Sequence, residues 1–315
     1  GILVVADSTV VEGFSVHGAA GLGPFGYHAG IGVDGARGCR LAGNRCGSSW
    51  GLRNDAGMAF RAADGVEVTG NEVAWGTAGF WIEECTGGVW RDNDVHDFRA
   101  VADAAGFSVR GRDRKVVATA ERNLIAGNRV ADCNLGVYLA TGARRHVIAE
   151  NTITGNWVGV LVREGSGENV LTGNVVRDNL SRGIQIDDSH HNTLVRNVCR
   201  DNPVGIWLGY AEPFDLGSDH DTVVLNTITG STVVGLRTTV RSEGNEFYMN
   251  EFVDNAVHVE AAGQAEWWTP TAMSFFHAGV NHADHLGNFY DTYAGNDLDG
   301  DGIPDVADAY PSDGR

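Results

Sequence analysis

The sequence predicts an all-β protein, a right-handed parallel β-helix in which a single-stranded solenoid winds through about ten coils. Two consecutive units of 23 residues, 151–173 and 174–196, each open with asparagine and carry a glycine followed by an apolar–x–apolar run. A period in the low twenties is typical of a solenoid whose repeat forms one coil. The apolar alternation has a period of two, which indicates strands, and no stretch of ten residues shows helical spacing. Parallel coils connected in this way are expected to be right-handed.

An asparagine marks the start of each predicted coil. The aligned positions are Asn44, Asn71, Asn93, Asn128, Asn151, Asn174, Asn197, Asn226 and Asn250. Stacked asparagine side chains at a turn can hydrogen-bond to one another and to the neighbouring backbone along the axis. We therefore assign these residues a structural role, as an asparagine ladder.

A glycine precedes each apolar strand of one predicted sheet, at Gly30, Gly57, Gly79, Gly106, Gly136, Gly159, Gly183, Gly205 and Gly235. The first and third residues after each glycine are mostly apolar and are predicted to face the core, so the second and fourth face outward. The outward positions carry Trp81, Tyr138 and Trp207 beside acids and arginines. Such a face is suited to stacking sugar rings. Alternatively, the alternating signs of Asp34, Arg61, Glu83 and Arg110 form ion pairs between neighbouring coils.

Long insertions enter one edge of this sheet in the first coils, at 18–29, 44–57 and 93–106, where function tends to concentrate on a rigid scaffold. Lyase or epimerase chemistry needs a carboxylate neutraliser, a base and a proton donor. The candidates are Arg61, Arg110 or Arg99 as neutraliser, His28 as base and Tyr138 as donor. Hydrolysis would need two carboxylates, with Asp55, Glu83 and Asp103 as candidates. The expected substrate-binding residues are Trp50, Trp81, Arg99, Arg163, Gln185, Asp187 and Trp207.

The composition narrows the choice of partner and compartment. A formal net charge of −18 argues against nucleic acid, which needs a basic surface. No apolar run is long enough to span a membrane, and no signal peptide is present. The chain begins inside a predicted strand, so we expect a leader or cap before it. We expect a monomer that is secreted, periplasmic or on the cell surface. The five cysteines are predicted to be small buried hydrophobes; the alternative is one disulfide, Cys39–Cys46.

The repeat fades from Gln264, which gives three predicted parts: a β-helix over 1–263, a cap segment over 264–295, and a calcium-binding loop and tail over 296–315. The loop places carboxylates at positions 1, 3, 5, 9 and 12 around Gly302, the arrangement that a hard cation needs. The predicted Ca²⁺ ligands are Asp297, Asp299, Asp301, Asp305 and Asp308. In the cap, His277, His282 and His285 either pack at the surface or bind Zn or Cu.

The repeats of the form N-x-[VI]-x-[DG]-N-x-x-G-[IV]-x-[LIV], the segment GNFYDTY at 287–293 and the acidic loop resemble the NosD-like right-handed β-helix proteins. These belong to the wider group of carbohydrate-binding and sugar-hydrolysis β-helix domains. The resemblance covers nearly the whole chain and implies the fold. That group contains polysaccharide lyases, epimerases, glycosidases and non-catalytic periplasmic proteins linked to copper-site assembly. No catalytic motif of the group can be carried over to a residue of this chain.

Two functions follow from the sequence. The first is a secreted protein that binds or processes a polysaccharide or cell-surface glycan in a groove on one sheet face. The alternative is a non-catalytic NosD-like scaffold or accessory protein in the periplasm or on the cell surface, with a possible link to copper.

Overall fold

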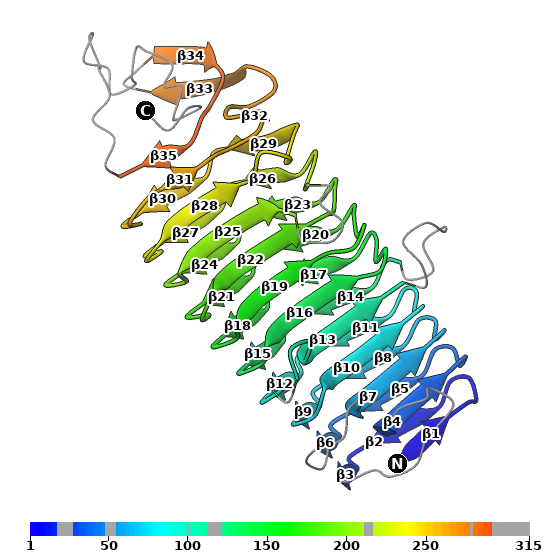
Figure 1. Cartoon of the computed structure of the whole chain (residues 1–315). Helices are drawn as coiled ribbons and strands as arrows, with labels where there is room; N and C mark the ends of the chain where they lie inside the picture. The colour runs from blue at the N-terminus through cyan, green and yellow to red at the C-terminus, as the bar shows by residue number, and fades with distance from the viewer. Residues whose placement is uncertain are drawn as a thin grey trace.

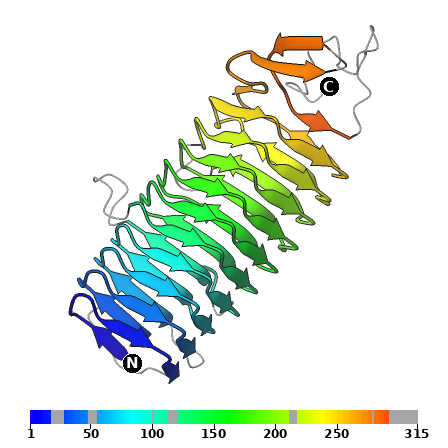
Figure 2. The ribbon, with the colours of Figure 1, turned by 180° about the vertical axis from the view of Figure 1, so that it is seen from behind.

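The computed structural model describes residues 1–17, 28–47, 55–99, 101–111, 121–210, 217–277 and 280–291. Within these ranges the side chains at positions 55, 275–277, 280, 282 and 284 are not described. The chain forms a rod of stacked coils with the first coil at one end and the last at the other (Figure 1). The view from behind shows the same stack of strands (Figure 2). No helix occurs in the part of the chain that the structure describes.

Each coil contributes one strand to each of three parallel sheets, and each sheet has eleven described strands. The first sheet contains β1 (Ile2–Val4), β4 (His28–Asp34), β7 (Asp55–Arg61), β10 (Ala78–Glu83), β13 (Ala105–Arg110), β16 (Leu135–Ala140), β19 (Val158–Val162), β22 (Arg182–Asp187), β25 (Val204–Gly209), β28 (Val234–Thr238) and β31 (Val259–Glu260). The predicted parallel β-helix is confirmed, with eleven coils described where the sequence indicated about ten.

The other two sheets are built mainly from strands of three residues. The second contains β2 (Val10–Glu12), β5 (Arg40–Ala42), β8 (Glu67–Thr69), β11 (Val89–Arg91), β14 (Leu124–Ala126), β17 (Val147–Ala149), β20 (Val170–Thr172), β23 (Thr193–Val195), β26 (Thr222–Val224), β29 (Asn245–Tyr248) and β32 (Ala265–Glu266). The third contains β3 (Ser15–His17), β6 (Arg45–Gly47), β9 (Glu72–Ala74), β12 (Asp94–His96), β15 (Arg129–Ala131), β18 (Thr152–Thr154), β21 (Val175–Arg177), β24 (Val198–Arg200), β27 (Thr227–Thr229), β30 (Glu251–Val253) and β35 (Phe289–Tyr290). An antiparallel hairpin, β33 (Met273–His277) and β34 (Val280–Asp284), follows the last coil.

The core runs along the axis of the rod. The first and third residues after each marker glycine are buried in it, as the alternation predicts. Identical positions stack on successive coils, so Phe80 and Phe107 lie with their rings 4.8 Å apart and nearly parallel. All five cysteines are buried and free, which confirms that they serve as small hydrophobes and not as a disulfide. Burial raises the pKa of four of their thiols, those of Cys46, Cys85, Cys133 and Cys199, to about 12.

The marker glycines are required by close packing between coils. A Cβ at Gly136 would lie 2.4 Å from the carbonyl oxygen of Gly159, and one at Gly159 would lie 2.6 Å from that of Gly183. Real Cβ atoms do not approach backbone oxygens so closely. The column of glycines therefore allows successive strands of the first sheet to approach closely at this position.

The predicted asparagine ladder forms at the turn between the second and third sheets. In each rung the backbone amide of one asparagine donates to the Oδ1 of the next, at 2.9–3.1 Å, from Asn44 through all nine predicted positions to Asn288. The Nδ2 of Asn151 also donates to the carbonyl of Ile125 at 2.9 Å. Each side chain thus satisfies buried backbone groups on two coils.

Two further ladders occupy the other turns. Between the third and first sheets, Cys133, Asn156, Asn179 and Asn202 are linked in sequence. Between the first and second sheets the links pass through Asn123, His146, Asn169, Asn192, Asp221 and Asn245. Every corner of the rod is therefore held in register by axial hydrogen bonds.

The described part of the predicted cap segment packs on the last coils. Trp267 stacks on Phe247 at 4.7 Å and Tyr290 on Phe252 at 5.1 Å, so two aromatic pairs cover the end of the core. The Oδ1 of Asp291 lies 2.9 Å from Nε2 of His258. The domain boundaries themselves stay predictions.

Asp221 places a carboxylic acid where the third ladder otherwise uses an amide. Its Oδ1 accepts from the backbone amide of Asn192 at 2.7 Å, whereas its buried Oδ2 has no hydrogen-bond partner. At equivalent positions the amide nitrogens of Asn169 and Asn245 donate to backbone carbonyls. Burial raises the pKa of Asp221 well above its ordinary value, because the charged form is poorly solvated there.

We predict that Asp221→Asn increases the free energy of unfolding at pH 7 by about 1 kcal/mol or more, since the new amide can donate as its neighbours do. The folded-state pKa is raised, so the unfolded chain loses this proton first. Wild-type stability should therefore fall as pH rises above about 3.9, and the variant should lack that contribution. Urea unfolding from acid to neutral pH measures both. Asp254→Asn, at an exposed turn, is the matched control, and a variant no more stable than wild type would contradict the prediction.

Candidate functional site

The outer face of the first sheet carries the predicted aromatic residues in one straight column. Backbone register pairs Trp81 with Ser108, Ser108 with Tyr138, and continues through Leu161 and Gln185 to Trp207. We call these six residues the aromatic column. Because successive strands stack in register, the prediction that Trp81, Tyr138 and Trp207 share one outer face is confirmed.

At the N-terminal part of the column an arginine lies between two aromatic rings. The Cζ of Arg110 is 4.6 Å from the centroid of the Trp81 ring and 5.3 Å from that of Tyr138. Its Nε donates to the hydroxyl of Ser108 at 3.0 Å. Trp81 donates from its indole nitrogen to Glu83 at 3.3 Å. The cation–π contacts hold the guanidinium against the sheet and leave its two terminal nitrogens without a carboxylate partner.

The fourth residue after the marker glycine, which also faces outward, differs between coils in its contacts. Arg61 forms a bidentate ion pair with Asp34, two N–O contacts of 2.9 Å, as the ion-pair alternative predicts. Glu83 and Arg110 are opposite each other in register but form no such pair. Arg61 is thus neutralised by its neighbour, and Arg110 is not.

A second cluster lies three to five coils further along. The Cζ of Arg182 is 4.4 Å from the centroid of the Trp207 ring, and that of Arg237 is 5.5 Å away. Arg182 donates to Oε1 of Gln185 at 2.9 Å, and Nε2 of Gln185 donates to Oδ2 of Asp187 at 2.5 Å. The neutral amide of Gln185 therefore separates a cation from an acid on the same strand.

Asp187 is only 2% exposed, and its Oδ1 has no hydrogen-bond partner. Burial raises the pKa of this carboxyl group, against the opposing effects of the hydrogen bond from Gln185 and the charges of Arg163 and Arg182. Burial likewise lowers the pKa of Arg182 and raises that of Tyr138. The face thus contains a carboxyl group and a phenol whose pKa values burial raises, both close to arginines.

Three arginines on this face lack a carboxylate partner. Among the described residues, Arg110, Arg163 and Arg182 form no ion pair. By contrast, arginines on other faces lie 2.7–2.9 Å from a carboxylate oxygen: Arg40, Arg45, Arg91, Arg129 and Arg145. In a chain with a net charge of −18, three uncompensated guanidinium groups on one face are suited to an anionic ligand.

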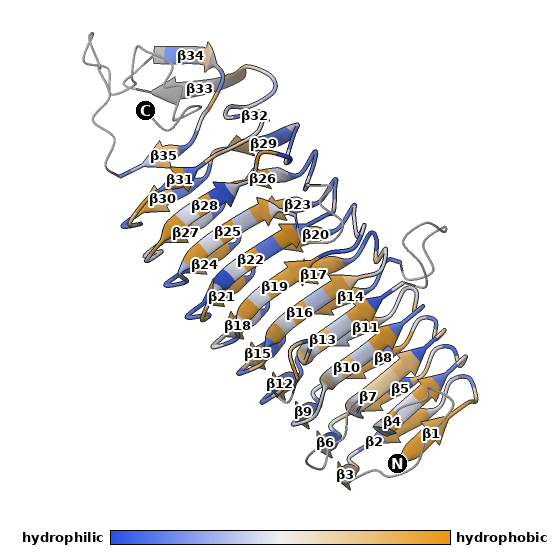
Figure 3. Ribbon diagram, in the orientation of Figure 1, coloured by the Kyte–Doolittle hydropathy of each residue, from blue (hydrophilic) through white to orange (hydrophobic). Residues whose placement is uncertain are grey.

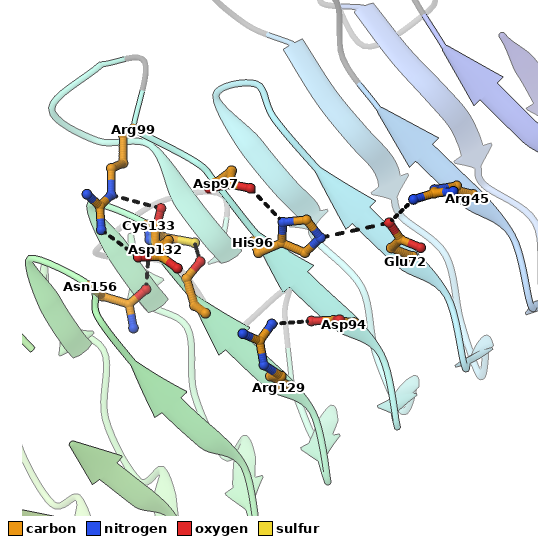
Figure 4. Close-up of polar contacts among 11 residues, drawn as sticks. Arg45, Glu72, Asp94, His96, Asp97, Arg99, Arg129, Asp132, Cys133 and Asn156 are labelled. Carbon is orange, nitrogen blue, oxygen red and sulfur yellow. Dashed lines mark hydrogen bonds and ion pairs between the residues drawn. The ribbon is translucent and has the colours of Figure 1, made fainter. Parts of the chain in front are cut away.

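Arg99 takes a different place from the one expected. Figure 4 shows it at the turn between the third and first sheets, where it reaches two later coils. It donates to the carboxylate of Asp132 at 2.8 Å, to the carbonyl of the same residue at 3.0 Å and to the carbonyl of Gly155 at 2.7 Å. These contacts tie three coils together, and the residue lies outside the strand positions that form the aromatic column.

The remaining predicted residues are not gathered at the column. His28 is paired in register with Asp55 on the next strand, but the side chain of Asp55 is not described. Asp103 is exposed at the turn before β13, and its charge contributes to the raised pKa of Tyr138. Trp50 and the calcium loop at 297–308 lie outside the described residues. Their predicted roles stay predictions.

Two residues of the second cluster, Arg182 and Arg237, were not among the candidates from the sequence. Arg237 is the second residue after the marker glycine Gly235, a position that the alternation places on the outer face. Arg182 directly precedes the marker glycine Gly183, and strict alternation would have pointed it toward the core, so its place beside Trp207 could not be predicted from the spacing.

The described residues contain no group of three or more histidine, cysteine or acidic side chains that could hold a metal ion. His285 lies with Nδ1 2.5 Å from the carbonyl oxygen of Thr269. The side chains of His277 and His282 are not described, so the predicted histidine cluster stays a prediction. In the described ranges no helix has the length and apolar character needed to cross a membrane.

We predict that Arg182 and Trp207 are energetically coupled. A double-mutant cycle of Arg182→Ala and Trp207→Leu, measured by urea unfolding, should give a coupling free energy of about 0.5–2 kcal/mol. A control cycle that pairs Trp207→Leu with Arg177→Ala, on the third sheet, should give none. Additive effects at Arg182 and Trp207 would show that the stacking in this cluster contributes no stability.

Solved structures with the same fold have low sequence identity to this chain. A mutant of the periplasmic alginate epimerase AlgG aligns with a TM-score of 0.58 and 16% identity, over 84% of this chain and 69% of that one. The Azotobacter vinelandii mannuronan C-5 epimerase AlgE4 A-module gives 0.53 and 12%, over 84% and 80%. DFA-IIIase from Arthrobacter chlorophenolicus A6 in complex with GF2 gives 0.55 and 14%, over 76% and 65%. All three likenesses establish the fold alone.

No curated protein sequence matches the chain. The family model described as "Periplasmic copper-binding protein (NosD)" matches residues 101–295, well over half of the chain. The chain therefore belongs to the NosD family of right-handed parallel β-helix proteins.

Proposed function

We propose that this protein binds an acidic polysaccharide on the outer face of the first sheet. The observation that carries the proposal is the set of three arginines, Arg110, Arg163 and Arg182, which lack an ion-pair partner on a face that also carries aromatic side chains. A guanidinium group can bind a carboxylate through two parallel hydrogen bonds. An aromatic ring beside it can receive the apolar face of a sugar. The two together recognise a sugar that carries a carboxylate.

The comparisons support a glycan as the class of ligand. Two of the three structures with the same fold are named as epimerases of alginate or mannuronan, which are acidic polysaccharides. The family description supports a periplasmic location. The high negative charge of the chain as a whole would repel such a polymer from every other face, which favours binding at the arginines.

Processing of the bound polysaccharide is the second candidate, and Asp187 favours it. Its carboxyl group keeps a proton to a higher pH than usual, and one of its oxygens is unpartnered beside two arginines. A general acid held near a carboxylate neutraliser is part of what lyase and epimerase chemistry needs. Asp187 is buried, however, so binding must first expose it. Other acids on strands of the face are engaged: Asp34 with Arg61, Glu83 with Trp81 and Glu260 with Arg237. Binding without turnover therefore fits the geometry better.

We predict that the protein binds polymannuronate more tightly than a neutral glucan, by about tenfold or more, in titration calorimetry. Replacing Arg163 and Arg182 together by glutamine should weaken binding to the acidic polymer by about tenfold. Added salt should weaken it as well, because the attraction is partly electrostatic. Arg129→Gln, which removes an ion-paired arginine of the third sheet, is the matched control and should bind as wild type does.

The same samples distinguish the two candidates. Release of an unsaturated product or of new reducing ends, abolished by Asp187→Asn, would establish processing. Binding without either product would leave a binding protein. If neither acidic nor neutral polysaccharide binds, the proposal is wrong, and the copper-related role suggested by the family description becomes the reading to pursue.

A further inference from the structure

We propose that the ligand is an extended acidic glycan that lies along the rod axis, one sugar per coil, and that tight binding needs a chain of about six units. This inference rests on the proposed function. It follows from the positions of two clusters, which we call the N-terminal platform (Trp81, Arg110, Tyr138) and the C-terminal platform (Arg182, Trp207, Arg237).

The two platforms lie in one line at a fixed separation. The aromatic column passes from Trp81 to Trp207 in five coil steps, each established by backbone register. At about 4.8 Å per step the two indole rings are roughly 24 Å apart along the axis. A single sugar or disaccharide can therefore contact one platform only, and a longer chain is needed to reach both.

The backbone positions of the unpaired arginines lie on two sides of the column, from which the guanidinium groups of Arg110 and Arg182 reach the column residues. Arg110 and Arg163 both follow the column position of their strand by two residues, and they are two coils apart, which is about 10 Å. Arg182 comes one coil later and precedes the column residue Gln185 by three positions, so it lies on the opposite side of the column. Along the rod, the backbone positions of Arg110 and Arg163 thus lie on one side of the column, two coils apart. The backbone position of Arg182 lies on the other side, one coil further on.

This order matches an extended polymer of uronic acids. In a flat 1,4-linked chain each sugar is turned over relative to the last, so carboxylates alternate between the two edges. The advance per sugar is close to the rise of one coil. If the carboxylate of one sugar lies at Arg110, the carboxylate of the second sugar after it lies at Arg163. The carboxylate of the third sugar after it lies at Arg182. The terminal sugars of the six then lie over Trp81 and Trp207.

The column positions between Trp81 and Trp207 carry no charged residue. Tyr138 and Leu161, neighbours in the column, belong to an apolar cluster with Leu135 and Val158, in which every side chain is at most 8% exposed. Figure 3 shows β19 in apolar colours, whereas β22 and β28 carry hydrophilic segments. The middle of the path, at Tyr138 and Leu161, is thus apolar, and the guanidinium groups of Arg110 and Arg182 lie on either side of it along the axis.

Binding at two linked platforms makes affinity depend on chain length. Once a chain can reach the second platform, that contact is intramolecular and raises the affinity without any new kind of interaction. Calorimetric titration with mannuronate oligomers of three to eight units measures this. We expect the hexamer to bind at least about tenfold more tightly than the trimer, and the octamer to add little more. Cello-oligosaccharides, with a similarly flat backbone but no carboxylates, should bind at least about tenfold more weakly at each length.

Variants test whether the length effect comes from the two platforms. Trp207→Ala should remove most of the hexamer's advantage and leave trimer affinity within about twofold, because the trimer still has the N-terminal platform. Trp157→Ala, at an exposed tryptophan on a turn outside the column, should keep the full advantage. Thermal melts establish that each variant is folded, and Arg182→Gln, a milder change of the same platform, replaces Trp207→Ala if that variant is not.

The outcomes separate this inference from the proposed function. Tight binding of acidic oligomers with equal affinity from trimer to octamer would overturn the axial, two-platform arrangement and leave the proposed function in place. Loss of the length effect in Trp157→Ala would also overturn it. Absence of binding at every length would overturn the proposed function itself.

Discussion

The structure depends on the axial hydrogen bonds that fix each coil directly above the last. At the corner between the second and third sheets, Oδ1 of Asn174 accepts both the backbone amide and the side-chain amide of Asn151. The same bond recurs from coil to coil, and two further ladders act at the other corners. A slip by one residue would break all three sets at once and turn every core side chain toward water. The register is therefore determined by the turns and not by the short strands, most of which have three residues in two of the sheets.

Strict register converts a sequence repeat into columns of side chains. Inside the rod it stacks Phe80 on Phe107, and outside it places arginines next to aromatic rings that are far away in the sequence. Arg110 and Tyr138 are 28 positions apart, yet they occupy adjacent coils on one face. The proposed site needs no loop to assemble it, since each of its arginines and aromatic residues lies on or directly beside a strand of the first sheet. Its precision comes from the same backbone that forms the core.

The columns were predictable because their cause is local. Asparagine at each turn and glycine before each strand give the phase of every coil, and from that phase the inward and outward residues follow by alternation. Arg182 could not be found in this way, because strict alternation points the residue before Gly183 toward the core, whereas its side chain lies beside Trp207 and Gln185. The loops are different. Arg99 lies in an insertion whose path no repeat specifies, and it binds Asp132 and Gly155 on later coils. The buried acid Asp187 could be placed on the outer face from spacing, but its burial depends on the packing of long side chains around it, which spacing does not determine.

The units 151–173 and 174–196 have the same length and the same pattern, and each adds one complete turn of the solenoid. Gain or loss of such a unit leaves the corners on either side matched, because these two coils carry asparagine at all three corners and offer the same donors and acceptors there. Duplication of a unit then lengthens the rod by one coil and leaves the fold unchanged. A binding surface along the outside of the rod is therefore lengthened or shortened by the height of one coil whenever evolution adds or removes a unit.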